Sequence, residues 1–103
     1  MDKIEGLKEI LALDPNNSFA RYGMAMELAG RGETESALDE FSTLLANDPD
    51  YTAAYFMAAQ TVANEARVPE AIEQLKDGIA SAKRTGNNHA LSEMQAMIDE
   101  LDR

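Results

Sequence analysis

Apolar residues recur along this chain at the three- and four-residue spacings of amphipathic α-helices. On the second such stretch, four residues share one helical face: Arg21, Met24, Ala25 and Leu28. Turn segments rich in Pro, Gly and Asn separate the stretches. They lie at residues 14–17, 30–32, 48–50, 68–69 and 84–88, and Thr34 is the predicted N-cap of the third helix. The pattern predicts six helices with short connections, antiparallel neighbours and no strand.

The same pattern repeats with a period of 34 residues. Residues one period apart are identical or similar, as in Leu7 and Phe41, Asp14 and Asp48, Pro15 and Pro49, Ala25 and Ala59, and Ala37 and Ala71. A fixed period in this range indicates stacked supersecondary units, each of which needs a neighbour to bury its apolar face. The repeated alanines are predicted where helices cross closely, because overpacking such a site typically costs ~1–3 kcal/mol.

These residues resemble the tetratricopeptide repeat (TPR) family, whose signature ends with Ala, Phe and Pro in the second helix of a repeat. The first full repeat carries Met24, Ala25, Leu28, Ala37, Phe41 and Pro49, and the second carries Tyr55, Ala58, Ala59, Val62, Ala71 and Leu75. Two positions depart from the family pattern. Arg21 stands at an aromatic site, and Lys83 replaces the terminal Pro of the second repeat, which predicts that the fifth helix continues to about Arg84.

The resemblance implies an all-α fold, a right-handed α-α superhelix (solenoid) of antiparallel helix pairs with about 2.5 TPR-like repeats and a C-terminal capping helix. We expect one domain over residues 1–103. It divides into a half repeat at 1–17, full repeats at 18–51 and 52–85, and a capping helix at 86–103.

The faces opposite the predicted core are unusually apolar. The second helix carries Phe19, Tyr22 and Met26 there, and no charged residue occurs between Tyr51 and Asn64 in a chain that is 27% charged. A helix that is apolar nearly all round is either buried or presents its second face to a ligand. In the family, the first helices of successive repeats line a concave groove. The resemblance therefore implies a set of candidate peptide-binding residues: Phe19, Tyr22, Met26, Phe56, Met57, Gln60, Asn64 and His89.

Two other interpretations stay open. Phe56 and Met57 are also consistent with a central helix that is buried on both sides, although the groove is the favoured interpretation. The first helix carries an apolar arc wider than one contact strip, made of Ile4, Leu7, Ile10, Leu11 and Leu13. This arc could form a homodimer, the chain could be a fragment of a longer TPR protein, or the helix could tilt so that its apolar face is covered within the chain.

Composition narrows the classes of partner. Nine basic and 19 acidic residues leave a net charge of −10, which disfavours nucleic acid and anionic membranes and favours a protein partner with apolar anchors and nearby Lys or Arg. The chain has no Cys, and its single His, His89, has no nucleophile or orienting partner in sequence. We predict a cytoplasmic protein-interaction module, an adaptor, scaffold or assembly factor, with no enzymatic activity, cofactor or metal.

Overall fold

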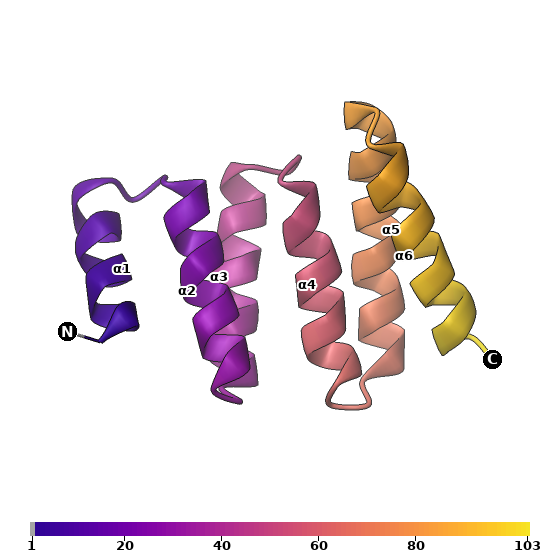
Figure 1. Cartoon of the computed structure of the whole chain (residues 1–103), viewed down its shortest axis with the longest axis horizontal. Helices are drawn as coiled ribbons and strands as arrows, with labels where there is room; N and C mark the ends of the chain where they lie inside the picture. The colour runs from indigo at the N-terminus through magenta and orange to yellow at the C-terminus, as the bar shows by residue number, and fades with distance from the viewer. Residues whose placement is uncertain (1) are drawn as a thin grey trace. The chain divides into compact units, whose positions relative to one another are not determined.

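The computed structural model describes residues 2–103, and within them it has six α-helices and no strand (Figure 1). The helices are α1 (Lys3–Leu13), α2 (Ser18–Gly30), α3 (Thr34–Asn47), α4 (Thr52–Ala63), α5 (Val68–Thr85) and α6 (Asn88–Leu101). Consecutive helices run antiparallel within α1 to α3 and within α4 to α6 (Figure 1). The predicted all-α fold of antiparallel helix pairs is confirmed.

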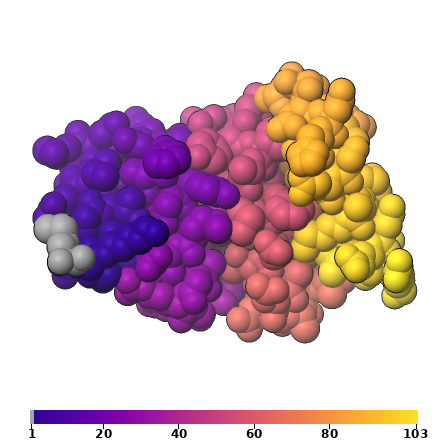
Figure 2. Space-filling view, viewed as in Figure 1, coloured from indigo at the N-terminus to yellow at the C-terminus, as the bar shows by residue number. Residues whose placement is uncertain are grey.

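The chain forms two compact units that meet in sequence between Asp48 and Pro49. The first contains α1 to α3 and the second contains α4 to α6. Side chains fill the space between the ribbons of each unit, as Figure 2 shows. The division of a single domain into stacked repeats stays a prediction.

Local capping explains where several helices begin and end. The side chain of Asn17 accepts a hydrogen bond from the Ala20 amide, and that of Asn87 accepts one from the Ala90 amide, so the asparagines cap α2 and α6. Gly86 ends α5 with a left-handed φ of 69°, a conformation that suits Gly. The predicted extension of the fifth helix to about Arg84 is confirmed, since α5 ends one residue later.

One expected cap is wrong. The Thr34 hydroxyl suggests an N-cap from sequence, but Thr34 is already the first helical residue of α3, and Glu33 occupies the cap position. The reason lies in the preceding turn. Gly32 adopts a φ of 78°, and the Glu33 amide donates to the Leu28 carbonyl, which turns the chain into α3 one residue earlier.

The core of the first unit forms where α2 packs against α3. Ala25 and Ala37 are fully buried, as the repeat pattern predicts for a close crossing. Phe41 and Leu44 of α3 fill the space beside them. The ring of Tyr22 meets Phe41 edge to face, with ring centroids 6.4 Å apart, so this half-buried tyrosine also contributes to packing.

The core of the second unit centres on α5. Ala59 and Ala71 are fully buried, again at the predicted crossing. Gly78 lies so close to its neighbours that an added Cβ would be 2.5 Å from Met94 Sδ and 2.7 Å from Tyr55 Cβ. The α5–α6 packing therefore depends on a residue without a side chain, which the repeat pattern does not indicate.

Polar groups at one end of this core are paired. The hydroxyls of Thr52 and Ser81 are both buried and lie 2.7 Å apart. The Tyr55 hydroxyl donates to the Pro49 carbonyl over 2.7 Å, and burial raises the pKa of Tyr55. Arg84 Nη2 lies 2.7 Å from Asp50 Oδ1 beside them. These contacts tie the start of α4 to the end of α5.

Candidate functional site

An apolar cleft opens between α1 and α2 in the first unit. Its volume is about 380 Å³, and its lining residues are Lys3, Leu7, Phe19, Tyr22, Gly23, Met26 and Glu27. We call it the α1–α2 cleft. On α2, residues 19, 22, 23 and 26 share one face at helical spacing. Helix α1 supplies the opposite wall through Leu7. Three residues predicted from sequence, Phe19, Tyr22 and Met26, thus meet at one concave surface.

These three residues differ in how free they are to meet a partner. The exposed fraction of Phe19 is 79%, which is unusual for so large an apolar side chain. Tyr22 and Met26 are half-buried, and Tyr22 also packs on Phe41. Phe19 is therefore the residue whose removal would perturb a partner contact with the smallest effect on folding.

Two charged residues stand at the rim of the α1–α2 cleft. Lys3 Nζ lies 3.8 Å from Glu27 Oε2, and the Glu27 side chain also lies 3.4 Å from the guanidinium of Arg31. The Lys3 side chain is largely exposed, so its contact with Glu27 contributes little to stability. A basic group on a partner could compete for the carboxylate of Glu27.

Four further candidates form a stripe along α4, made of Phe56, Met57, Gln60 and Asn64. Phe56 and Met57 are half-buried, whereas Gln60 and Asn64 are exposed. Half-burial is consistent with a core role and with a binding role for the two apolar residues. The α4 stripe belongs to the second unit, so its union with the α1–α2 cleft in one groove stays a prediction.

His89 lies in the first turn of α6 and is exposed. Its Nε2 atom is 2.5 Å from Oε1 of Glu93, one helical turn further along α6. The contact is local to α6, and the place of His89 in a peptide-binding surface also stays a prediction.

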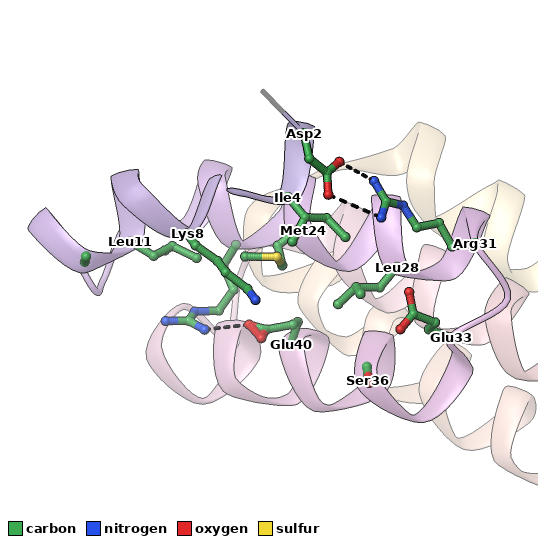
Figure 3. Close-up of a pocket in the computed structure, with 12 residues that line it drawn as sticks. Asp2, Ile4, Lys8, Leu11, Met24, Leu28, Arg31, Glu33, Ser36 and Glu40 are labelled. Carbon is green, nitrogen blue, oxygen red and sulfur yellow. Dashed lines mark hydrogen bonds and ion pairs between the residues drawn. The ribbon is translucent and has the colours of Figure 1, made fainter. Parts of the chain in front are cut away.

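A second, larger cleft lies on another face of the first unit, between α1 and α3 (Figure 3). Its volume is about 630 Å³. We call it the α1–α3 cleft. Apolar side chains of α1 and α2 line its bottom, namely Ile4, Leu11, Met24 and Leu28. Charged residues surround them: Asp2, Lys8, Arg21, Arg31, Glu33 and Glu40.

Ion pairs hold the walls of the α1–α3 cleft. Arg31 Nη2 donates to Asp2 Oδ1 over 2.6 Å, and the hydrogen bond to this guanidinium keeps the pKa of Asp2 below its usual value. Arg21 Nη1 donates to Glu40 Oε1, also over 2.6 Å. The first pair joins the start of α1 to the end of α2, and the second joins α2 to α3.

Sequence reasoning missed several residues that shape these clefts. Leu7 appeared only as part of the apolar arc of the first helix, yet it forms a wall of the α1–α2 cleft. Gly23 lies in the middle of α2, where an added Cβ would meet Leu7 Cδ2 at an ordinary 3.5 Å. A glycine inside a helix is intrinsically unfavourable, and that was the available signal.

The described residues give no sign of a metal site or a membrane span. Within residues 2–103, no group of three or more His, Asp or Glu side chains is arranged to hold a metal ion. In the same range, no helix is both long enough and apolar enough to cross a bilayer.

Comparison with solved structures supports the repeat architecture. A tetratricopeptide repeat domain protein from Salinibacter ruber is 31% identical, with a TM-score of 0.79 over 85% of this chain and 89% of its own. The protein BPP2914 from Bordetella parapertussis has a TM-score of 0.85 over 100% of this chain and 90% of its own. At 23% identity, that second likeness shows the fold alone. A third structure, YrrB, described as a TPR protein with an unusual peptide-binding site, is 29% identical with a TM-score of 0.69, over 73% of this chain and 39% of its own.

Sequence comparison gives the family. No family model matches the chain. However, the TPR repeat-containing protein PA0015 from Pseudomonas aeruginosa is 31% identical over 103 residues, which are 97% of this chain and 95% of that protein. Identity at this level along nearly the whole of both chains shows that this protein belongs to the tetratricopeptide repeat family.

Proposed function

We propose that this chain is a protein-interaction module that holds an amphipathic helix or peptide in the α1–α2 cleft. The observation that carries the proposal is the convergence of Phe19, Tyr22 and Met26 on one concave surface. Aromatic rings offer rigid apolar contact area, and Met adapts to varied shapes. An exposed apolar surface of this kind is typical of sites that bind another polypeptide.

The charge of the chain indicates the chemistry of the partner. With a net charge of −10, the protein attracts basic segments and repels phosphate backbones. Glu27 supplies an acidic group at the rim of the cleft itself. We therefore expect a ligand with apolar anchors flanked by Lys or Arg. The known peptide-binding site of YrrB, a relative of similar fold, agrees with this class of function.

The proposal includes the α4 stripe as a second contact region, with the amides of Gln60 and Asn64 as hydrogen-bonding groups for a peptide backbone. It includes His89 at the edge of that region. It assigns no catalytic step and no cofactor to the chain, and it places the interaction in the cytoplasm. The partner is then held by apolar contacts, charge and hydrogen bonds, with no covalent step.

The test is a selection of peptides from a displayed random library, followed by affinity measurements on the enriched sequences by fluorescence anisotropy. We expect enriched peptides to carry apolar anchors and Lys or Arg. Phe19→Ala removes an exposed anchor and should weaken their binding by roughly tenfold, about 1.4 kcal/mol. Leu13→Ala is the matched control, because Leu13 is 91% exposed and lines neither cleft.

A second variant separates binding from folding. Gly23→Leu places a side chain into the α1–α2 cleft beside Leu7, while replacement of a mid-helix Gly favours the helix by roughly 0.5–1 kcal/mol. We expect this variant to fold and to lose peptide binding. Peptides that bind Phe19→Ala and Gly23→Leu as tightly as the unaltered protein would exclude this cleft as the site.

Self-association through α1 is a second candidate function. Ile10 is 44% exposed and Leu13 is 91% exposed, and both lie on the same helix as Leu7 of the cleft wall. A homodimer would cover these side chains. Ile10→Asp would then shift a dimer to a monomer in light scattering. A protein that is strictly monomeric at high micromolar concentration would rule this candidate out.

A further inference from the structure

We infer that the α1–α3 cleft is a second docking site, separate from the proposed peptide site, and that it takes an amphipathic helix of a partner protein with acidic groups at one end and basic groups at the other. The inference goes beyond the proposed function, because it concerns another face of the first unit and a ligand of different charge pattern.

The two clefts are physically distinct. They share no lining residue. The α1–α3 cleft is lined by Arg21, Met24 and Leu28 of α2 and by Arg31 just after its end. The α1–α2 cleft is lined by residues 19, 22, 23, 26 and 27 of the same helix. At about 100° per residue, these sets lie on opposite faces of the helix. One ligand segment therefore cannot occupy both clefts.

The bottom of the α1–α3 cleft suits the apolar face of a helix. Ile4 and Met24 are buried, and Leu11 and Leu28 are half-buried, so the four form a continuous apolar floor that is not fully covered. The walls α1 and α3 run in the same direction, because each is antiparallel to α2 (Figure 1). A groove with an apolar floor and charged walls is the surface that an amphipathic helix recognises.

The charged residues that line the cleft determine which charges a bound helix should carry at its two ends. Asp2 pairs with Arg31, and Glu40 pairs with Arg21, so these four charges are already balanced. Lys8 and Glu33 remain. Both line the cleft and are exposed, and within residues 2–103 neither takes part in an ion pair. In Figure 3, Lys8 extends into the cleft from α1, and Glu33 stands toward the other end beside Arg31.

These two charges of opposite sign define the partner. A helix with an acidic group near Lys8 and a basic group near Glu33 satisfies both, whereas a uniformly charged segment gains one attraction and suffers one repulsion. Nucleic acid is disfavoured for the same reason, since its phosphates would meet Glu33 and a protein of net charge −10. The ligand is thus a polypeptide with charges of both signs.

Three synthetic helical peptides of about 15 residues test the inference, a length at which an isolated helix becomes marginally stable. All three carry the same stripe of Leu residues. The first has Glu at one end and Lys at the other, the second has Lys at both ends, and the third has Glu at both ends. We expect the mixed peptide to bind about fivefold tighter than either uniform peptide at low salt.

Charge reversal in the protein should then change the preference in a defined direction. Lys8→Glu leaves both ends of the cleft acidic, so the peptide with Lys at both ends should become the tightest ligand. Glu33→Lys should favour the peptide with Glu at both ends. Glu33→Gln repeats the test without a new charge at the start of α3, and should remove the preference at that end only. Lys83→Glu, on α5 and outside both clefts, is the control for net charge.

Each possible result either supports or overturns the α1–α3 cleft as a second docking site. Preferences that follow the charge at positions 8 and 33, and that persist in Phe19→Ala and Gly23→Leu, support the second site even if the α1–α2 cleft proves inactive. Equal binding of the three peptides, or a preference that Lys83→Glu alters as much as Lys8→Glu does, overturns it. Binding that is lost in Phe19→Ala places the peptide in the other cleft. Binding abolished by dimerisation of the protein assigns the surface to a second copy of the chain, and either result overturns the inference.

Discussion

Arg21 Nη1 donates a hydrogen bond to Glu40 Oε1 over 2.6 Å and so joins α2 to α3. In the family pattern, the position of Arg21 holds an aromatic residue. Here the guanidinium replaces apolar contact by an ion pair, and its Nη2 also donates to the Pro15 carbonyl at 3.0 Å. The side chains of Arg21 and Glu40 are only 18% and 25% exposed, which limits screening of the pair by solvent.

A double-mutant cycle on this pair should therefore show measurable coupling. We expect Arg21→Met and Glu40→Gln to be coupled by about 1 kcal/mol in the free energy of unfolding, above the median for fully exposed pairs. Urea denaturation followed by circular dichroism measures it. The exposed pair Arg67 and Glu70 is the comparison, and coupling no larger than at that pair would show that partial burial adds nothing.

Gly78→Ala should destabilise the second unit. The new Cβ would lie 2.7 Å from Tyr55 Cβ, which cannot move without displacing α4, and 2.5 Å from Met94 Sδ. Overpacking of this kind costs about 1–3 kcal/mol, more than the gain of up to ~1 kcal/mol in helix propensity. Gly23→Ala is the control with room for its Cβ and should stabilise the protein by about 0.5–1 kcal/mol. Thermal unfolding compares the two, and equal effects would mean that α5 and α6 pack less closely than described.

Gly32 and Ala66, one repeat period apart, both adopt a left-handed backbone, with φ of 78° and 59°. The turns match in hydrogen bonding as well, since the Glu33 amide donates to Leu28 and the Arg67 amide to Val62, each over 3.0 Å. Only Gly adopts this conformation without strain. We expect Ala66→Gly to raise the free energy of unfolding by about 0.5 kcal/mol and Gly32→Ala to lower it by about 1 kcal/mol. Urea denaturation of both variants tests whether the left-handed backbone at positions 32 and 66 favours Gly. A loss of stability in Ala66→Gly would contradict this.

The Asp2–Arg31 pair should make stability depend on pH in the acidic range. The hydrogen bond from Arg31 lowers the pKa of Asp2 in the folded state, so the stabilising contribution is fully present above the ordinary carboxyl pKa of the unfolded chain. It is lost as the pH falls through the lowered value. Arg31→Gln should return the pKa of Asp2 toward its ordinary range, as an NMR titration of the side-chain carboxyl carbon would show. Arg103→Gln, in the second unit, should leave the titration unchanged.

Much of the local structure follows from neighbouring residues in the sequence. The Asn17 and Asn87 caps, the Gly86 stop and the length of α5 depend on hydrogen bonds between residues a few positions apart, and each agrees with the pattern. The cap assigned to Thr34 was wrong by one position, because the left-handed Gly32 and the hydrogen bond to Leu28 set the start of α3. The burial of Ala25, Ala37, Ala59 and Ala71 was predictable because the 34-residue period marks equivalent crossings.

The candidate site was predictable only in part. The second apolar face of α2 could be identified from helical periodicity, and its residues Phe19, Tyr22 and Met26 do share a cleft. That the cleft needs Leu7 and Gly23, and that α3 helps to form another, depends on which side chains of different helices come opposite one another. Periodicity within one helix does not show which of its side chains lie opposite those of another helix.

Helix positions, caps, repeat period and net charge were therefore properties of the linear chain, because they arise from local hydrogen bonding, side-chain spacing and composition. Tertiary packing alone decided that Gly78 meets Tyr55 and Met94 and that Arg21 pairs with Glu40. It also decided that Lys8 and Glu33 border one cleft while neither is ion-paired to any of residues 2–103. Each of these depends on the distance and rotation between helices, which only the assembled side chains of several elements determine together.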